Sequence, residues 1–245
     1  PVIVGGFLFS DNNGGVEVPY TVMGGIVLIA ARIFSRVQLP EISAKSDDKE
    51  KAAGSDSSKQ GLGATIRDLW KRKTFRYGLV ALFCYEIAEI SINSLFINYA
   101  TSDGWMDKAT ASIVLSFGAL GLFMVARIAG SAIMSKVKAE KVLFVCAIMT
   151  VLGATAVALD LGAVSKAGVV VCYAFEAIMF PTIFAITISD AGKSVKIASS
   201  FLMMTPIGGA VGTSMMGLMA DATSMSTAFV VPAIGYFFVL VYALR

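Results

Sequence analysis

The sequence predicts an all-α polytopic membrane protein, and two observations carry that prediction. Apolar residues come in blocks of the length that crosses a bilayer as a helix, which is roughly 20 residues. Basic residues gather in alternate connections between these blocks, as the positive-inside rule requires. The 245-residue chain is also 56% hydrophobic and only 15% charged, which is too little charge to cover the surface of a soluble domain.

We expect seven membrane-spanning helices, at about residues 18–38, 78–100, 109–132, 141–161, 168–189, 198–220 and 225–244. These blocks are too long and too uniformly apolar for the alternating strands of a β-barrel. The chain begins at Pro1, and residues 1–9 resemble the end of a further apolar helix. We therefore interpret the sequence as a fragment whose N-terminal part is missing.

The connection after the first block carries ten Lys and Arg residues from Arg36 to Arg76, and Arg245 ends the chain. This pattern predicts that the connection and the C-terminus are cytoplasmic. The polar, low-complexity centre of the connection predicts a disordered linker. Its last part sets Ile66, Leu69 and Trp70 among basic residues, which predicts a short amphipathic helix on the inner leaflet. A binding site for a regulator is the less favoured interpretation.

Ionisable residues inside two of the blocks indicate a functional site, because such residues are costly in a membrane. Glu86, Glu89 and Asn93 are spaced i, i+3, i+7 and so share one helix face. Glu176 lies inside another block, and Pro181 follows it, freeing a backbone carbonyl and bending the helix. The alternative is that Glu89 and Glu176 only pair with polar neighbours and hold helices together.

The six helices after the linker repeat as acidic, glycine-rich and plain, and then in the same order again. The glycine-rich helices hold Gly118, Gly121 and Gly130, and the G-x-x-x-G pair Gly208 and Gly212, which allow close helix packing. Because each unit has three helices, the second is inverted in the membrane. This is the inverted-repeat pattern of secondary transporters.

The remaining residue types indicate no cofactor, metal or nucleic-acid partner. The chain has no histidine, and its three cysteines, Cys84, Cys146 and Cys172, lie in predicted spans without a C-x-x-C pair. We expect the cysteines to be small buried residues. No nucleophile–base pair occurs at helical spacing, so we do not expect an enzyme.

Several motifs resemble the fucose:proton symporter family of sugar permeases, within the major facilitator superfamily. "FPTIF" at 180–184, "SDAGK" and "ASSFLMMTPIGGAVGTSMMGLMAD" are similar to that family's tenth and eleventh helices. "LPEI" at 39–42 and "FCYEIAEISINSLFINYA" resemble the end of its sixth helix and its seventh helix. "ARIAGSAIMSKVKAEKVL" resembles the loop motif between helices eight and nine, where Arg127 and Gly130 match but Ala126 replaces a common glycine.

This resemblance covers nearly the whole chain and implies its organisation. Residues 1–38 would be the end of helix five and helix six of the N-terminal half, 39–76 the cytoplasmic linker, and 77–245 the C-terminal six-helix bundle. The family implies uptake of a hexose or deoxyhexose, such as fucose, glucose or galactose, across the plasma or inner membrane by alternating access. Proton coupling is also implied, although the best-known coupling carboxylates of the family lie in helices one and four, which this chain lacks.

We expect two sets of site residues. Those expected to line the sugar site are Glu89, Asn93, Asn98, Glu86, Ser91, Glu176 and Thr182, of which Glu86 has no usual counterpart in the family. Those expected to shape or gate the helices are Pro181, Arg127, Gly130, Gly208 and Gly212. The other expected partners are the proton, the lipid bilayer and the missing N-terminal half.

Two other functions remain open at this point. A seven-helix receptor fits the topology, but the sequence lacks an acidic-Arg-Tyr/Phe motif, an N-P-x-x-Y motif and an extracellular cysteine pair. A passive sugar facilitator would have the same fold and the same sugar contacts without the proton.

The predicted topology can be tested with one cysteine in the linker. We expect Ser57→Cys to react with a membrane-impermeant thiol reagent only from the inner face, because positively charged loops stay inside. The parent chain, with its cysteines in predicted spans, is the control. Labelling of Ser57→Cys in intact cells would contradict the topology.

Overall fold

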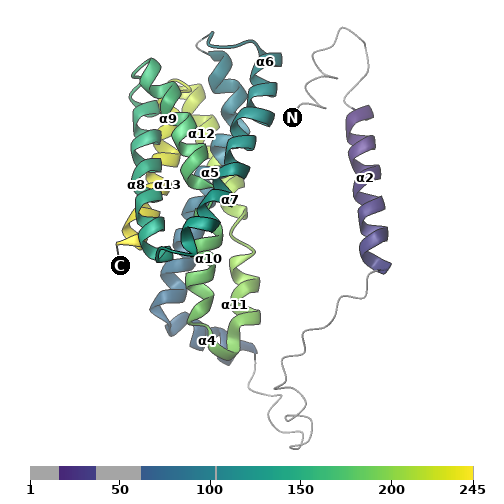
Figure 1. The fold of residues 1–245 in the computed structure, drawn as a ribbon, viewed down its shortest axis with the longest axis vertical. Helices are drawn as coiled ribbons and strands as arrows, with labels where there is room; N and C mark the ends of the chain where they lie inside the picture. Colours follow the sequence, from purple (N-terminus) through teal and green to yellow (C-terminus); the bar gives the residue numbers. More distant parts are fainter. Residues whose placement is uncertain (1–16, 37–61, 103, 245) are drawn as a thin grey trace, which may run out of the picture. The chain divides into compact units, whose positions relative to one another are not determined.

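The computed structural model describes residues 17–36, 62–102 and 104–244, and the regular structure of these residues is helical throughout (Figure 1). The chain divides into two units, Pro1–Arg67 and Asp68–Arg245. In the first unit, helix α2 (Glu17–Arg36) occupies the block predicted at about 18–38. The expected helix end at 1–9 and most of the predicted linker lie outside the described residues.

The second unit is a bundle of helices that run side by side (Figure 1). Its elements, with α4 beginning just before it, are α4 (Leu62–Lys71), α5 (Lys73–Ser102), α6 (Lys108–Ile113), the π-helix η1 (Val114–Ala119), α7 (Leu120–Met134), α8 (Ala139–Ala158), α9 (Ala163–Glu176), α10 (Met179–Ser189), the 3-10 helix η2 (Gly192–Ser194), α11 (Val195–Leu202), α12 (Ile207–Ala222), the 3-10 helix η3 (Thr227–Phe229) and α13 (Val230–Ala243).

Among the described residues, five helices are long and apolar enough to cross a membrane. They are Lys73–Ser102, Lys108–Met134, Ala139–Ala158, Ala163–Ser189 and Val195–Ala222. Each overlaps one predicted block, while the block at 225–244 forms the shorter apolar helix Thr227–Ala243. An all-α membrane fold is therefore confirmed, and the count of seven spans stays a prediction.

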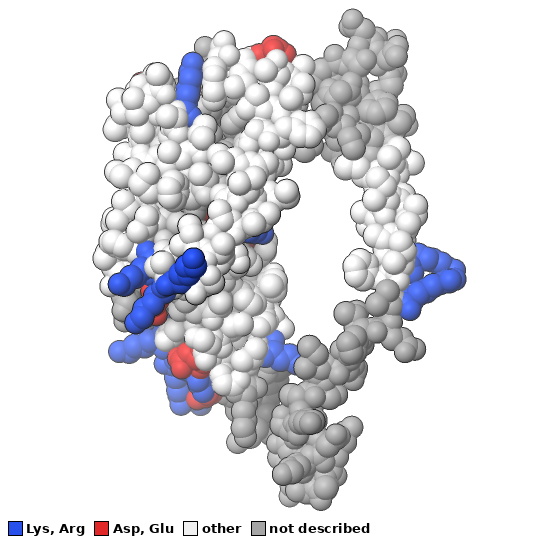
Figure 2. Space-filling view, viewed as in Figure 1, with Lys and Arg blue, Asp and Glu red and all other residues white. Residues whose placement is uncertain are grey.

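Charge is concentrated at one end of the second unit. On the face seen in Figure 2, most Lys and Arg side chains lie in the half of the bundle that carries α4, and few charged side chains lie in the other half. The beginning of α5, the α7–α8 connection and the beginning of α11 meet at this end (Figure 1). The structure thus gathers the connections that the sequence marks as basic.

Helix α5 is the central helix of the bundle, with α10, α11, α12 and α13 packed against it. Glycines in the partner helices allow this contact. A Cβ atom on Gly208 would lie 2.8 Å from the carbonyl oxygen of Phe83, and one on Gly212 would lie closer still to that of Ile87. The close approach expected at the G-x-x-x-G pair is therefore present.

Helices α8 and α9 approach each other in the same way. A Cβ on Gly153 would lie 2.7 Å from the carbonyl oxygen of Gly168, and a Cβ on Gly168 would lie 2.6 Å from that of Gly153. The other two glycines expected to pack, Gly118 and Gly121, make no comparable approach to the described residues. Close helix packing therefore rests on some of the predicted glycines and on others that were not singled out.

The start of the second spanning helix has a clear physical cause. Asp107 accepts hydrogen bonds from the backbone N–H groups of Ala109 at 3.0 Å and Thr110 at 3.1 Å, and so satisfies groups that have no partner within the helix. The Thr110 hydroxyl donates to the same carboxylate at 2.6 Å. These hydrogen bonds, led by that of the Thr110 side chain, hold the pKa of Asp107 below its ordinary value.

The close contact between α12 and α5 can be tested by adding a methyl group at the glycine that permits it. We expect Gly212→Ala to lower the free energy of unfolding in detergent by about 1–3 kcal/mol, because the new methyl group meets the α5 backbone. Gly217→Ala is a matched control on the same helix, since a Cβ there has no neighbour within 4 Å. Equal stability of the two variants would show that the predicted contact is absent.

Candidate functional site

The span Ala163–Ser189 is broken at residues 177–178, where α9 ends and α10 begins. Pro181 has no backbone N–H and cannot donate to the carbonyl of Ala177, four residues earlier. The Nε group of Arg127 in α7 donates to that carbonyl instead, at 2.9 Å. The carbonyl of Glu176 accepts a hydrogen bond from the Tyr85 hydroxyl of α5 at 3.0 Å. The break is thus held by side chains from two other helices.

Glu176 lies at the break and is fully buried. Its Oε2 atom accepts a hydrogen bond from the hydroxyl of Tyr236 in α13. Its Oε1 atom has no hydrogen-bond partner among the described residues, and neither has the buried hydroxyl of Tyr173 one turn earlier. A carboxyl group with spare hydrogen-bonding capacity therefore sits inside an apolar bundle.

Glu89 of α5 belongs to the same site. Its carboxyl group lies near the Tyr85 hydroxyl, the Arg127 guanidinium and the Glu176 carboxyl group. We use the name polar cluster for the six side chains that meet here, which are Tyr85, Glu89, Arg127, Tyr173, Glu176 and Tyr236. The structure therefore brings together the two glutamates that the sequence placed in different spans.

The other α5 residues expected at the site lie in differing surroundings. Glu86 is buried, and Asn93 is partly buried with an Oδ1 atom that has no described partner. Asn98 is exposed near the end of the helix. Ser91 is fully buried and donates to the carbonyl of Ile87 in its own helix, next to α12.

The hydroxyl group of Thr182 in α10 is also used in contacts within the bundle. Its hydroxyl donates to the carbonyl of Ile178 at 2.6 Å and lies 3.3 Å from the sulfur of Met134. Gly130 of α7 faces the break, since a Cβ there would clash with a methyl group of Ile178. The hydroxyl of Thr182, like that of Ser91, thus takes part in helix packing rather than in the polar cluster.

The three tyrosines of the polar cluster were not singled out from the sequence. Tyr85 precedes Glu89 by four residues and Tyr173 precedes Glu176 by three, so helical spacing was a usable signal for both. Tyr236 lies in a span without a charged residue and carried no signal. Arg127 resembled part of a loop motif, but it lies within α7, and only residues 135–138 connect α7 to α8.

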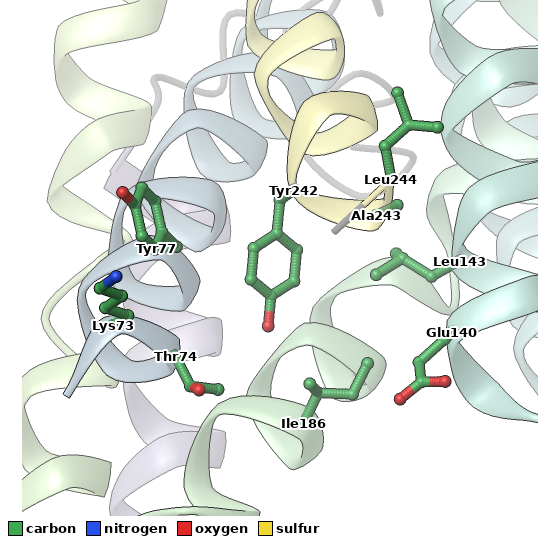
Figure 3. Close-up of a pocket in the computed structure, with 9 residues that line it drawn as sticks. All are labelled: Lys73, Thr74, Tyr77, Glu140, Leu143, Ile186, Tyr242, Ala243 and Leu244. Carbon is green, nitrogen blue, oxygen red and sulfur yellow. The ribbon is translucent and has the colours of Figure 1, made fainter.

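A cavity among the described residues lies apart from the polar cluster. It has a volume of about 500 Å³ and is lined by residues of α5, α8, α10 and α13 together with Leu244, which follows α13. Figure 3 shows the Tyr242 side chain in its middle, between Lys73 on one side and Glu140 on the other. None of the residues that line it belongs to the polar cluster, so the candidate site rests on buried contacts rather than on this cavity.

A bundle of apolar helices with broken spans beside buried ionisable residues is the architecture typical of secondary transporters. The chain is an integral membrane protein of the Major Facilitator Superfamily, because the model of that family matches residues 2–202. The expected membership in this superfamily is thereby confirmed.

The chain is similar to sugar transporters of bacteria. It is 29% identical to the L-fucose-proton symporter of Escherichia coli (strain K12), over 93% of this chain and 51% of that protein. It is 28% identical to the glucose/galactose transporter of Brucella abortus biovar 1 (strain 9-941), over 94% of this chain and 53% of that protein. The chain thus spans about half the length of these relatives.

A solved structure shows the same fold. The crystal structure of the Major Facilitator Superfamily transporter FucP in the outward conformation matches with a TM-score of 0.76 and 29% identity. The match covers 94% of this chain and 54% of that one. The resemblance to the fucose symporter group that the sequence motifs indicated is therefore confirmed by both sequence and structure.

The hydrogen bond that holds the break can be tested with a double-mutant cycle. We expect Arg127→Met to cost about 1–3 kcal/mol of unfolding free energy, because it leaves the buried Ala177 carbonyl without a donor. In a Pro181→Ala background the loss should be smaller, since the alanine would supply a backbone N–H for that carbonyl.

The matched control is Arg76→Met, which removes an exposed arginine of α5 away from the break. We expect it to change the unfolding free energy little in either background. An equal loss for Arg127→Met with and without Pro181→Ala would show that the proline and the arginine do not share this carbonyl.

Proposed function

We propose that this chain forms part of a permease that moves a hexose or deoxyhexose across the membrane together with a proton, by alternating access. The observation that carries the proposal is the match to the L-fucose-proton symporter and to FucP over nearly the whole chain. The glucose/galactose transporters among the relatives widen the expected substrates to hexoses in general. The substrate leaves chemically unchanged, so the activity is transport rather than catalysis.

The sugar contacts are proposed on α5. Glu89 is partly buried, and Asn93 follows one turn later with an unpartnered Oδ1 atom. A carboxylate accepts hydrogen bonds from sugar hydroxyls, and an amide both donates and accepts them. These two residues suit a ligand that presents several hydroxyl groups on one face.

The remaining predicted contacts rank below these two. Glu86 is buried near the middle of α5, and Asn98 is exposed toward the end of the same helix. The hydroxyl groups of Ser91 and Thr182 donate to backbone carbonyls of their own helices. We propose that they support helix packing, and that the rest of the sugar site comes from a second six-helix half of the same protein.

The orientation in the membrane follows from charge. The end of the bundle that carries α4 collects most of its Lys and Arg side chains (Figure 2). Positive loops are retained in the cytoplasm, so we propose that this end, residues 39–76 and the C-terminus face inward. We propose that the protein lies in the plasma or inner membrane, across which a sugar uptake system must carry its substrate.

The proposed sugar contacts predict a loss of affinity on substitution. In the full-length transporter we expect Glu89→Gln and Asn93→Ala each to weaken sugar binding by about 10- to 100-fold, because each removes a strong hydrogen bond worth roughly 1.5–3 kcal/mol. Surface abundance and sugar affinity are measured separately. Glu140→Gln, an exposed carboxylate of α8, is the matched control for Glu89→Gln.

Two outcomes would count against the proposal. Normal affinity at reduced abundance would show that Glu89 and Asn93 only brace the helices. Uptake that is the same with and without a pH gradient would identify a facilitator, in which no proton accompanies the sugar.

A further inference from the structure

Glu176 is the most thoroughly buried carboxyl group of the site. It is inaccessible to solvent, only its Oε2 atom has a hydrogen-bond partner, and that partner is the neutral hydroxyl of Tyr236. A carboxylate has about four lone-pair sites to satisfy. A buried charge is tolerated when it is paired and fully hydrogen-bonded, and Glu176 meets neither condition among the described residues.

The positive charge nearest to the break is already engaged. Arg127 donates its Nε–H to the Ala177 carbonyl, and its guanidinium carbon lies 4.9 Å from the centre of the Phe123 ring. No ion pair joins Arg127 to Glu89 or to Glu176 among the described residues. The Glu89 carboxyl group is the other acid close to Glu176, so ionising both would bring two like charges together without a bridging cation.

The titratable groups near Glu176 come from four helices. Tyr85 and Glu89 come from α5, Tyr236 comes from α13, and Arg127 reaches the adjoining carbonyl from α7. Cys172 and Tyr173 precede it on α9 and are themselves buried. Among these described groups none offers Glu176 a free cation.

We propose that Glu176 is a proton-binding site of this transporter, holding the proton as a neutral carboxylic acid in the state described here. The proposal rests on the function proposed above and moves Glu176 from the sugar contacts to the proton. A proton on Oε1 makes that atom a donor. The Tyr173 hydroxyl, one turn earlier on α9, is also buried without a described partner, so a small movement would be needed for it to accept this hydrogen bond.

The position of Glu176 at the break connects proton release to movement. Its carbonyl is held by Tyr85, its side chain by Tyr236, and the next carbonyl by Arg127. Ionising Glu176 requires water or a cation to reach Oε1, and the closed packing excludes both. Opening of the break therefore favours release of the proton, and closing favours its uptake.

Tyr85 links the break to Glu89. Its O–H donates to the Glu176 carbonyl, and Glu89 follows four residues later on α5. A sugar bound at Glu89 would therefore lie within about one helical turn of a side chain that holds the break.

Infrared spectroscopy of the purified full-length protein tests the protonation directly and needs no sugar. We expect a carbonyl stretch from a protonated carboxyl group that disappears in Glu176→Gln and persists in Glu140→Gln. A band that survives in Glu176→Gln, or is absent from the wild type, overturns the proposal.

Transport assays separate this proposal from the proposed function. With a pH gradient imposed, we expect Glu176→Gln to lose sugar accumulation and only equilibrate its substrate, while Glu140→Gln accumulates as the wild type does. Full accumulation by Glu176→Gln would overturn the proton site. Absence of sugar transport by the wild type would overturn the proposed function and leave the infrared test of Glu176 standing.

Discussion

The hydrogen bond from Arg127 to the carbonyl of Ala177 is the contact on which the candidate site depends. Pro181 makes this carbonyl available, and Gly130 lets α7 come close enough for the arginine to reach it. In a lipid environment an unsatisfied backbone group costs several kcal/mol, so the break persists only because a donor is supplied. With the break in place, α9 ends at Glu176, whose carboxyl group meets Tyr236 inside the bundle.

Two physical devices hold the bundle around this break. Helices in a bilayer gain little from apolar contact with each other, because lipid tails are equally apolar, so close backbone packing and hydrogen bonds decide which helices associate. The glycines of α12 provide the first device against α5, and the polar cluster provides the second between α5, α7, α9 and α13. The side chains that join the helices therefore include Glu89 and Glu176, the residues proposed above to meet a sugar and a proton.

Much of this arrangement could be predicted from residue types and spacing. Apolar length predicted the spans, and Glu89, Glu176 and Pro181 stood out because each is costly in a membrane helix. The rest could not be predicted for definite reasons. Tyr236 is an aromatic residue in an apolar span and becomes informative only when the fold sets it beside Glu176. From its sequence position, Ser91 is compatible both with a ligand contact and with a hydroxyl that donates to its own helix, as the structure has it. Gly118 and Gly121 look like packing residues, but a Cβ on Gly121 would meet no described atom within 4 Å.

The mutual contact of Gly153 and Gly168 has a mechanical consequence. Each glycine lies against the carbonyl oxygen of the other, so a shift of one helix along its partner by a single residue would drive a side chain into backbone. The register of α8 against α9 is therefore tightly constrained. The regular helix stops at residues 177–178, directly after Glu176. A rotation of the whole hairpin would then displace this carboxyl group without disturbing the α8–α9 contact.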